Sequence, residues 1–278
     1  MTPRTEGFYT ADELPIEEYH CDPAISQSGL KMFDQIPALY KAYRDGETDE
    51  NPTRGKFIGS AIHAAALEPD VFAEQYIVAP DKFKTGNAAG LKAWKEEQDP
   101  RKIILLDKDY KAVQGMHRKL HAHSWAGPRL RSATCEYSCF ARDPETGLMV
   151  RVRFDMLTPD GWILDLKKTA DISTQGITKA ISNYGYFIQN ALYLDVPGWL
   201  GDDYRPRGFV FVFVSDKPPY SVRVVFLTTE DVDRGRREYR RMLNAFALCV
   251  ESDYWPDYEE YPEPVMLTQW KRNEIDYR

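Results

Sequence analysis

The stretch from Asp155 to Lys167 constrains the fold most, because it predicts two strands joined by a tight turn. Asp155 ends the first strand, Pro159-Asp160-Gly161 supplies turn residues, and Asp165 precedes Lys167 by two places. Because side chains alternate along a strand, Asp165 and Lys167 project from the same face. Two carboxylates and an amine there can hold a divalent metal beside an attacking water, as in metal-dependent phosphodiester hydrolysis. Taken alone, the pattern also fits a hairpin with an exposed ion pair.

The rest of the chain predicts one α/β domain with helices added at its N-terminal side. Residues 1–24 are expected to be loosely ordered, and residues 25–278 to form a single domain. The apolar run Phe209–Val214 is typical of a strand buried on both faces. The expected elements are strands at 134–141, 148–157, 162–167, 209–214 and 220–227, and helices at 55–67, 107–122, 176–194 and 231–250.

Composition excludes some classes of protein and leaves others open. With 43% hydrophobic residues, the 278-residue chain is expected to be globular rather than disordered. A net charge of −7 does not indicate nucleic-acid binding, although locally basic positions (Arg54, Lys56, Lys82 and Lys84) are candidate DNA contacts. There is neither an apolar run of roughly 20 residues nor an apolar signal segment at the start, and four scattered cysteines fit a reducing compartment. We therefore expect a cytoplasmic protein without a membrane partner.

Glu136 is a candidate site residue on the strand before the one that carries Asp155. Strand alternation puts Glu136 on the face opposite Cys135, Tyr137 and Cys139. If those three residues belong to the core, Glu136 points toward the same polar cleft as Asp155. An ordinary surface glutamate is an equally good interpretation.

Three helical segments carry further candidates. His63 lies among alanines, a setting in which a histidine is usually a satisfied core residue. Gln189 and Tyr193 are four residues apart, so they share a helix face that can return to the cleft or simply be hydrated. His117 and His121 have the spacing of a zinc pair and His123 is close by, but no cysteine or acidic partner with suitable spacing accompanies them.

These candidates occur in a fixed order along the chain: Gly59-x3-His63 with Glu68, Glu136, Asp155, Asp165-x-Lys167 and Gln189-x3-Tyr193. That series resembles the RecB-like branch of the PD-(D/E)XK nuclease superfamily, and within it the RecE (exonuclease VIII) nuclease domains. The likeness extends over roughly residues 24–275, with Ser28-Gly-Leu-Lys and Lys168-Thr-Ala-Asp171 among the matching segments. It implies an α/β restriction-endonuclease-like core, in which a central mixed β-sheet is flanked by helices.

The resemblance also implies a Mg²⁺ or Mn²⁺ site. The positions that match its ligands are His63, Asp155, Asp165 and the carbonyl of Leu166. Asp165 stands where many members have glutamate, and its shorter side chain still reaches a metal. Some relatives hold an iron–sulfur cluster through a C-terminal cysteine triplet, but Cys249 is alone in that half of the chain, so we expect no cluster.

The remaining site positions follow from the same resemblance. Lys167 matches the lysine that orients or deprotonates the attacking water. Gln189 and Tyr193 match a QxxxY motif that orients active-site groups and DNA, and Glu136 matches an acidic residue at the edge of the site.

The implied activity is a 5′→3′ exonuclease acting on double-stranded DNA ends. Such an enzyme leaves 3′ single-stranded tails for recombination by a strand-annealing protein of the RecT type, as in phages and prophages, and a toroidal homo-oligomer is expected. Three other functions stay open: an endonuclease or single-strand nuclease on the same fold, a catalytically inactive DNA-binding module, and a small-molecule metallohydrolase that uses the His117 cluster.

Overall fold

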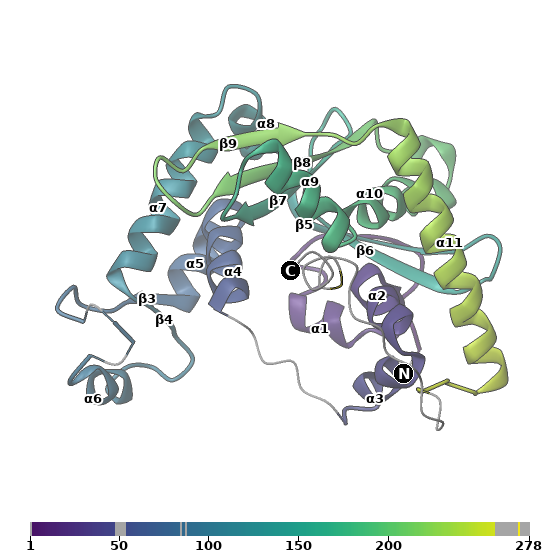
Figure 1. The fold of residues 1–278 in the computed structure, drawn as a ribbon, viewed down its shortest axis with the longest axis horizontal. Helices are drawn as coiled ribbons and strands as arrows, with labels where there is room; N and C mark the ends of the chain where they lie inside the picture. Colours follow the sequence, from purple (N-terminus) through teal and green to yellow (C-terminus); the bar gives the residue numbers. More distant parts are fainter. Residues whose placement is uncertain (1, 48–53, 84, 87, 259–271, 273–278) are drawn as a thin grey trace.

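The computed structural model describes residues 2–47, 54–83, 85–86, 88–258 and 272 (Figure 1). In this part of the chain, one mixed sheet of seven strands has the order β1-β5-β6-β7-β8-β9, with β2 beside β6. β7 runs parallel to β8 and β2 parallel to β6, whereas the other pairs are antiparallel. The strands are β1 (Gly7–Tyr9), β2 (Ile25–Ser26), β5 (Thr134–Arg142), β6 (Met149–Leu157), β7 (Trp162–Thr169), β8 (Gly208–Ser215) and β9 (Val222–Val225). The predicted central mixed sheet is confirmed.

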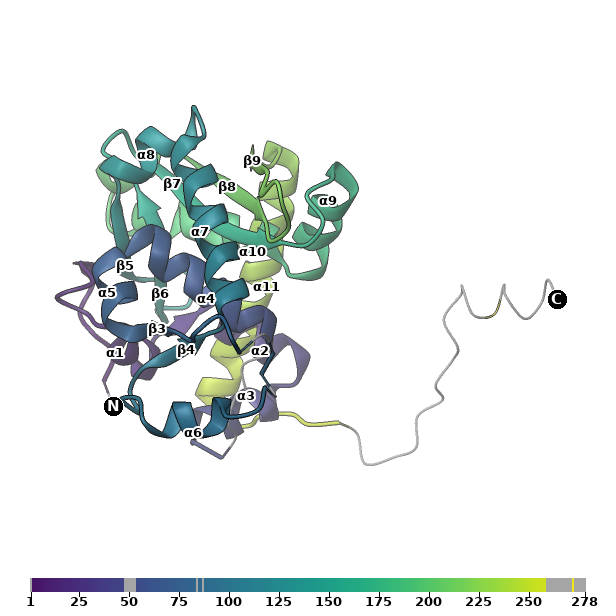
Figure 2. The same ribbon diagram turned by 90° about the vertical axis from the view of Figure 1, so that its left-hand side faces the viewer.

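Helices cover both faces of the sheet (Figures 1 and 2). One layer consists of α2 (Gln27–Gln35), α9 (Thr174–Asn183), α10 (Tyr186–Asp195) and α11 (Thr229–Ser252). The opposite layer consists of α4 (Arg54–Leu67), α7 (Asp107–Ala122) and α8 (Ala126–Ser132). The smaller elements are α1 (Ile16–Cys21), α3 (Pro37–Arg44), α5 (Pro69–Gln75), α6 (Leu91–Glu96), a two-stranded sheet of β3 (Tyr76–Val78) and β4 (Ile103–Leu105), and 3₁₀ turns at Pro197–Trp199 and Asp202–Tyr204. Among the described residues, none of these helices has the length and apolar character that a bilayer crossing requires.

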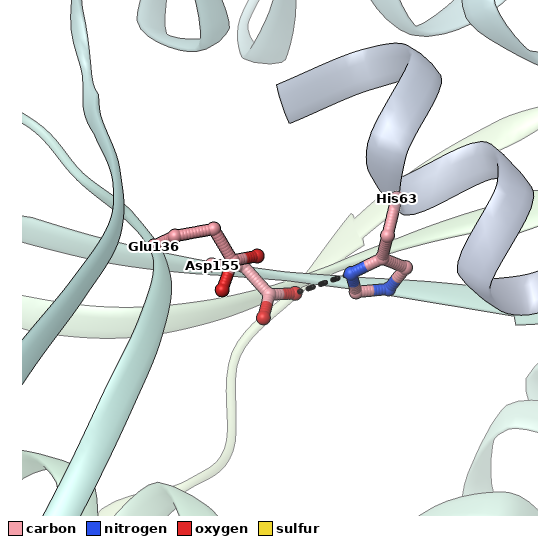
Figure 3. Close-up of side chains that lie close together, drawn as sticks. All are labelled: His63, Glu136 and Asp155. Carbon is pink, nitrogen blue, oxygen red and sulfur yellow. Dashed lines mark ion pairs between the residues drawn. The ribbon is translucent and has the colours of Figure 1, made fainter. Parts of the chain in front are cut away.

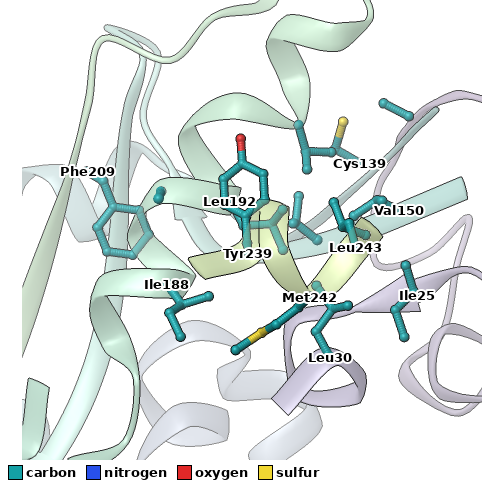
Figure 4. Packing of buried hydrophobic residues seen from close by; sticks show 14 of the residues in the cluster. Ile25, Leu30, Cys139, Val150, Ile188, Leu192, Phe209, Tyr239, Met242 and Leu243 are labelled. Carbon is teal, nitrogen blue, oxygen red and sulfur yellow. The ribbon is translucent and has the colours of Figure 1, made fainter. Parts of the chain in front are cut away.

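Two apolar clusters meet at β8. Phe209, Phe211 and Phe213 face the α10/α11 cluster, which also contains Leu192 and Leu243 (Figure 4). Val210, Val212 and Val214 face the α4/α7 cluster on the other side of the sheet. The prediction of a strand buried on both faces is therefore confirmed, and β8 is the rigid centre beside which β7 is placed.

Truncation in this core has a predictable cost. Phe211 is 0% exposed, so Phe211→Ala should lower the free energy of unfolding by about 3–5 kcal/mol through lost burial and a residual cavity. Phe226→Ala is the matched control, because that ring is 76% exposed and its loss should change stability by less than about 0.5 kcal/mol. Urea denaturation of the metal-free protein measures both. A cost below about 1 kcal/mol for Phe211→Ala would contradict this packing.

The expected helix over 176–194 is wrong in one respect, because the structure splits it into α9 and α10. Gly185 lies between them with φ 65°, a left-handed conformation that a residue without Cβ adopts readily. α10 therefore begins at Tyr186, and its fourth residue, Gln189, reaches Asp165 of β7.

The segment 2–24, expected to be loosely ordered, contains short elements that the sequence did not predict. β1 pairs with β5, and α1 follows it. Leu14 is 0% exposed and packs with Tyr19, Phe140 and Met149 in a small cluster. These short elements lack a clear periodicity in the sequence because tertiary packing, rather than local propensity, stabilises them.

Candidate metal centre

The site forms where β6 and β7 separate. Their ladder contains only the pairs Met156–Leu164 and Leu157–Ile163. Beyond these pairs, the Asp155 carboxylate takes the acceptor role that a backbone carbonyl has in a strand ladder. Its Oδ2 accepts the N–H of Leu166 at 2.7 Å. The two strands are thus joined through a side chain, and the carboxylate is held in the gap between them.

Glu136 lies opposite Asp155 on β5, at the one position where the register of β5 and β6 is interrupted. Its φ is 49°, which is rare for a non-glycine residue. The interruption breaks the alternation of faces that the sequence predicts. Cys135 packs in the α4/α7 cluster, whereas Tyr137 and Cys139 pack in the α10/α11 cluster. Those three residues therefore do not share a face. Glu136 nevertheless lies close to His63 and Asp155.

His63 lies on α4, in the helical layer that α4 forms with α7 and α8. On α4, its neighbours Ala61, Ile62 and Ala65 are buried against the sheet. His63 Nε2 lies 2.7 Å from the carbonyl oxygen of Leu166. A carbonyl only accepts, so Nε2 carries the proton and Nδ1 is left with its lone pair. Metal-binding histidines are commonly held in this way, with one ring nitrogen donating to a backbone carbonyl.

Three possible ligand groups converge at this point (Figure 3). His63, Glu136 and Asp155 can each offer one ligand atom, and those atoms lie within 4.8 Å of one another. His63 Nδ1 is 3.6 Å from Asp155 Oδ2. The His63 side chain is 30% exposed and that of Asp155 is 16% exposed, so the cluster is reachable from solvent.

Asp165 and Lys167 form a buried pair beside this cluster. Lys167 Nζ lies 2.6 Å from Asp165 Oδ2, and Gln189 Nε2 donates to Asp165 Oδ1 at 2.6 Å. The Asp165 side chain is only 1% exposed, and apart from the ion pair its Oδ2 accepts no hydrogen bond from the residues that the structure describes. The lysine also lies 4.7 Å from the centre of the Tyr186 ring. Gln189 therefore fixes Asp165, and Asp165 fixes the ammonium group.

Tyr193 lies one turn beyond Gln189 and packs mainly in the core. Its ring meets Phe154 and Phe209 edge-on, at centroid distances of 5.8 and 6.1 Å. Burial raises the pKa of its hydroxyl, which also interacts with Gln189. This position supports Gln189, whereas the predicted contact with DNA stays a prediction.

The electrostatics of the site fit a bound cation. Burial, followed by the nearby Asp155 charge, raises the pKa of Glu136 to about 7. Burial and the charge of Asp165 raise the pKa of Asp155. Burial and the Lys167 charge lower the pKa of His63, so its imidazole is neutral. Two carboxylates and a nitrogen lone pair that face one another repel, and a divalent cation between them relieves the repulsion.

Metal affinity should consequently depend on pH. Protons compete with a cation for the Glu136 and Asp155 carboxylates, and their raised pKa values place that competition near neutrality. The affinity for Mn²⁺ should rise at least about tenfold between pH 6 and pH 8, with proton uptake by the buffer when metal binds at pH 7. Calorimetric titration in buffers of different ionisation enthalpy measures both, and a pH-independent affinity would contradict this electrostatic account.

The structure brings together most of the residues that the sequence predicts, with different contacts for two of them. Leu166 contributes its N–H to Asp155 and its carbonyl to His63. Asp165 lies outside the three-residue cluster of ligand groups found in the described chain. The assignment of Asp165 and the Leu166 carbonyl as metal ligands stays a prediction. Sequence reasoning did not identify Arg153, whose Nε donates to Glu136 Oε2 at 2.8 Å.

The other predicted positions lie elsewhere. The rings of His117 and His121 are 4.2 Å apart, but in the described chain no third ligand group joins them as a metal site. Of the candidate DNA contacts, Lys84 lies outside the described residues, as do the side chains of Arg54 and Lys56. The Lys82 ammonium lies 5.0 Å from the centre of the Phe83 ring.

Comparison with known proteins agrees with this fold. The model of a family described as "PDDEXK-like domain of unknown function (DUF3799)" matches residues 26–265. The crystal structure of a candidate exonuclease from Eubacterium rectale is similar, with a TM-score of 0.64, over 93% of this chain and 96% of the other. The two sequences are 15% identical, so this likeness shows the fold alone. No curated protein matches the sequence.

Proposed function

The chain belongs to the family of PDDEXK-like domains of unknown function (DUF3799), and on this premise we propose that it is a divalent-metal-dependent deoxyribonuclease. One observation carries the proposal. The potential ligand groups of His63, Glu136 and Asp155 lie beside a buried Asp165–Lys167 pair, at the edge where two strands separate. A catalytically inactive DNA-binding module would have no need of this complete set.

The donor set fits Mg²⁺ or Mn²⁺. Carboxylate oxygens are suitable ligands for both ions, and the imidazole nitrogen favours Mn²⁺ over the harder Mg²⁺. His63 and Asp155 are already oriented by Leu166. When bound, such an ion supplies Lewis-acid polarisation of the scissile phosphate and a lower pKa for a water molecule.

The protein's own groups account for the remaining chemistry. Burial disfavours the charged form of Lys167, but the charges of Asp165 and Asp155 outweigh burial and raise the lysine pKa, so its ammonium stays charged at neutral pH. Asp165 holds the Lys167 ammonium in place. The ammonium can therefore donate hydrogen bonds to the attacking water and to oxygens on which negative charge develops. Gln189 keeps the Asp165 carboxylate oriented during the reaction.

The substrate is proposed to be the end of a DNA duplex, degraded in the 5′→3′ direction to leave a 3′ single strand. This specificity, the toroidal homo-oligomer and a partner annealing protein of the RecT type rest on the resemblance to RecE nuclease domains. The matching segments are spread over nearly the whole chain rather than confined to the site, which supports assignment to this branch.

Digestion of labelled DNA tests activity, polarity and end requirement together. Linear duplex carrying a label at either the 5′ or the 3′ end is incubated with the protein and Mg²⁺ or Mn²⁺, with EDTA as the control. We expect early release of the 5′ label, a 3′ label that stays on long single strands, and an intact closed circular duplex. Cleavage of the closed circle would indicate an endonuclease, and no cleavage with either metal would refute the proposal.

A further inference from the structure

Arg153 is buried beside the candidate metal centre, although it carries a positive charge. It lies on β6 two residues before Asp155, and its side chain is 7% exposed. Its Nε donates to Glu136 Oε2 at 2.8 Å. Its second nitrogen, Nη1, donates to the Leu14 carbonyl at 2.9 Å and to the Ser138 hydroxyl at 3.3 Å. The guanidinium thus connects an acidic residue of the site with the N-terminal part of the chain.

The N-terminal part encloses this arginine. The Leu14 side chain is fully buried, and the Tyr19 ring centre lies 5.4 Å from the Arg153 guanidinium carbon. Both residues pack in the small cluster with Phe140 of β5. Because β1 pairs with that same strand, the segment Gly7–Cys21 is fastened to the sheet at both its strand and its helix. The Leu14 carbonyl therefore presents a fixed acceptor.

Glu136 needs an external constraint to keep its position. Its positive φ is unfavourable for a residue with a side chain, and such conformations persist where surrounding contacts determine them. The hydrogen bond from Arg153 provides such a contact and uses only one carboxylate oxygen. The other oxygen, Oε1, is then left for the cluster with His63 and Asp155.

We infer that Arg153 is a positioning residue of the metal centre, which holds the Glu136 carboxylate toward His63 and Asp155 and is itself fixed by the N-terminal segment. The inference rests on the proposed function, because it concerns the same metal centre. It makes the segment Gly7–Cys21 a structural part of the site. Arg153 acts through Glu136, so its effect on metal binding should disappear when Glu136 can no longer bind as a carboxylate.

A double-mutant cycle on the full chain tests this dependence, with Mn²⁺ affinity read by electron paramagnetic resonance. Arg153→Gln should weaken Mn²⁺ binding by about 10–100-fold, as is typical when an outer partner of a metal ligand is lost. Glu136→Gln, which removes a candidate ligand itself, should weaken binding by at least as much. The double variant should bind Mn²⁺ as Glu136→Gln does. Arg153→Lys, which keeps the charge within reach of Glu136, should restore part of the affinity. If Arg153→Gln does not fold, two other comparisons test the same dependence: Arg153→Lys with wild type, and the double variant, which loses both charges of the pair, with Glu136→Gln.

Arg151→Gln is the matched control. Arg151 is equally buried on the same strand and packs against Tyr19 at 4.8 Å, but its guanidinium donates to the carbonyls of His20 and Asp22. Its loss should leave Mn²⁺ affinity within about twofold of wild type. Wild-type Mn²⁺ affinity in Arg153→Gln, or losses of Mn²⁺ affinity that add in the double variant, would overturn this inference but not the proposed function. A wild-type protein without a saturable Mn²⁺ site would overturn the proposed function as well.

Discussion

Lys167→Ala should lower the rate of DNA hydrolysis by about a hundredfold to a thousandfold, equivalent to about 3–4 kcal/mol of transition-state stabilisation. The ammonium of Lys167 is charged, held by Asp165 at 2.6 Å, and positioned beside the three candidate ligand groups. Its removal deletes a fixed donor where negative charge develops. The substrate affinity should change less than the rate, because the donor acts mainly in the transition state. Single-turnover cleavage of linear duplex at saturating Mg²⁺ measures the loss.

Lys168→Ala is the control for this variant. Lys168 is the next residue on β7, and its ammonium pairs with Asp216 at 3.0 Å rather than with the site. This variant should cleave DNA at nearly the wild-type rate. Cleavage by Lys167→Ala within about threefold of wild type would remove the lysine from the mechanism.

Asp155→Asn should weaken Mn²⁺ binding by at least about a hundredfold, because losing only an outer partner of a metal ligand already costs about 10–100-fold. The substitution keeps the shape of the side chain, and the amide oxygen that replaces a carboxylate oxygen can still accept the Leu166 N–H. The pKa of the Asp155 carboxyl is already raised, so the surrounding structure disfavours its negative charge. Removing that charge should therefore leave the metal-free variant folded. Calorimetric titration with Mn²⁺ at pH 8 measures the affinity.

Asp160→Asn provides the comparison for charge removal outside the site. Asp160 lies in the turn between β6 and β7, and its side chain is 47% exposed. Mn²⁺ affinity should stay within about twofold of wild type in this variant. Equal affinities for Asp155→Asn and wild type would show that the cation binds elsewhere.

The strands and their burial could be predicted from local patterns. Turn residues separate three of the strands, and the unbroken apolar run Phe209–Val214 requires cover on both faces. The shared face of Asp165 and Lys167 follows from alternation alone, and their ion pair is consistent with it. These features depend on neighbours in sequence, so a single sequence is enough to find them.

Features that depend on distant contacts could not be predicted in this way. Glu136 has no local signal for a positive φ, and the resulting change of face between Cys135 and Tyr137 reverses a simple alternation argument. Gly185 looks like a tolerated glycine within one long helix until the two helices are packed. The order of residues 7–21 depends on β5, which lies more than a hundred residues away.

The candidate site shows the same division. Resemblance to a known nuclease branch identified His63, Gln189 and Tyr193 as site positions, whereas composition gave no reason to choose them. The resemblance gave the Leu166 carbonyl only as a metal ligand. The hydrogen bonds of the Leu166 backbone to Asp155 and His63 could not be predicted, because its N–H and carbonyl become available only where β6 and β7 separate. Arg153 was not identified either, because its burial and its contact with Glu136 depend on cover by the N-terminal segment.

Anomalous diffraction from crystals grown with Mn²⁺ tests the central claim most directly, because it locates the cation independently of any activity. The account predicts a saturable peak about 2.0–2.3 Å from His63 Nδ1 and in contact with the Asp155 and Glu136 carboxylates, with the Nε2–Leu166 hydrogen bond kept. Peaks only at other positions, at Mn²⁺ concentrations that support DNA cleavage, would contradict it.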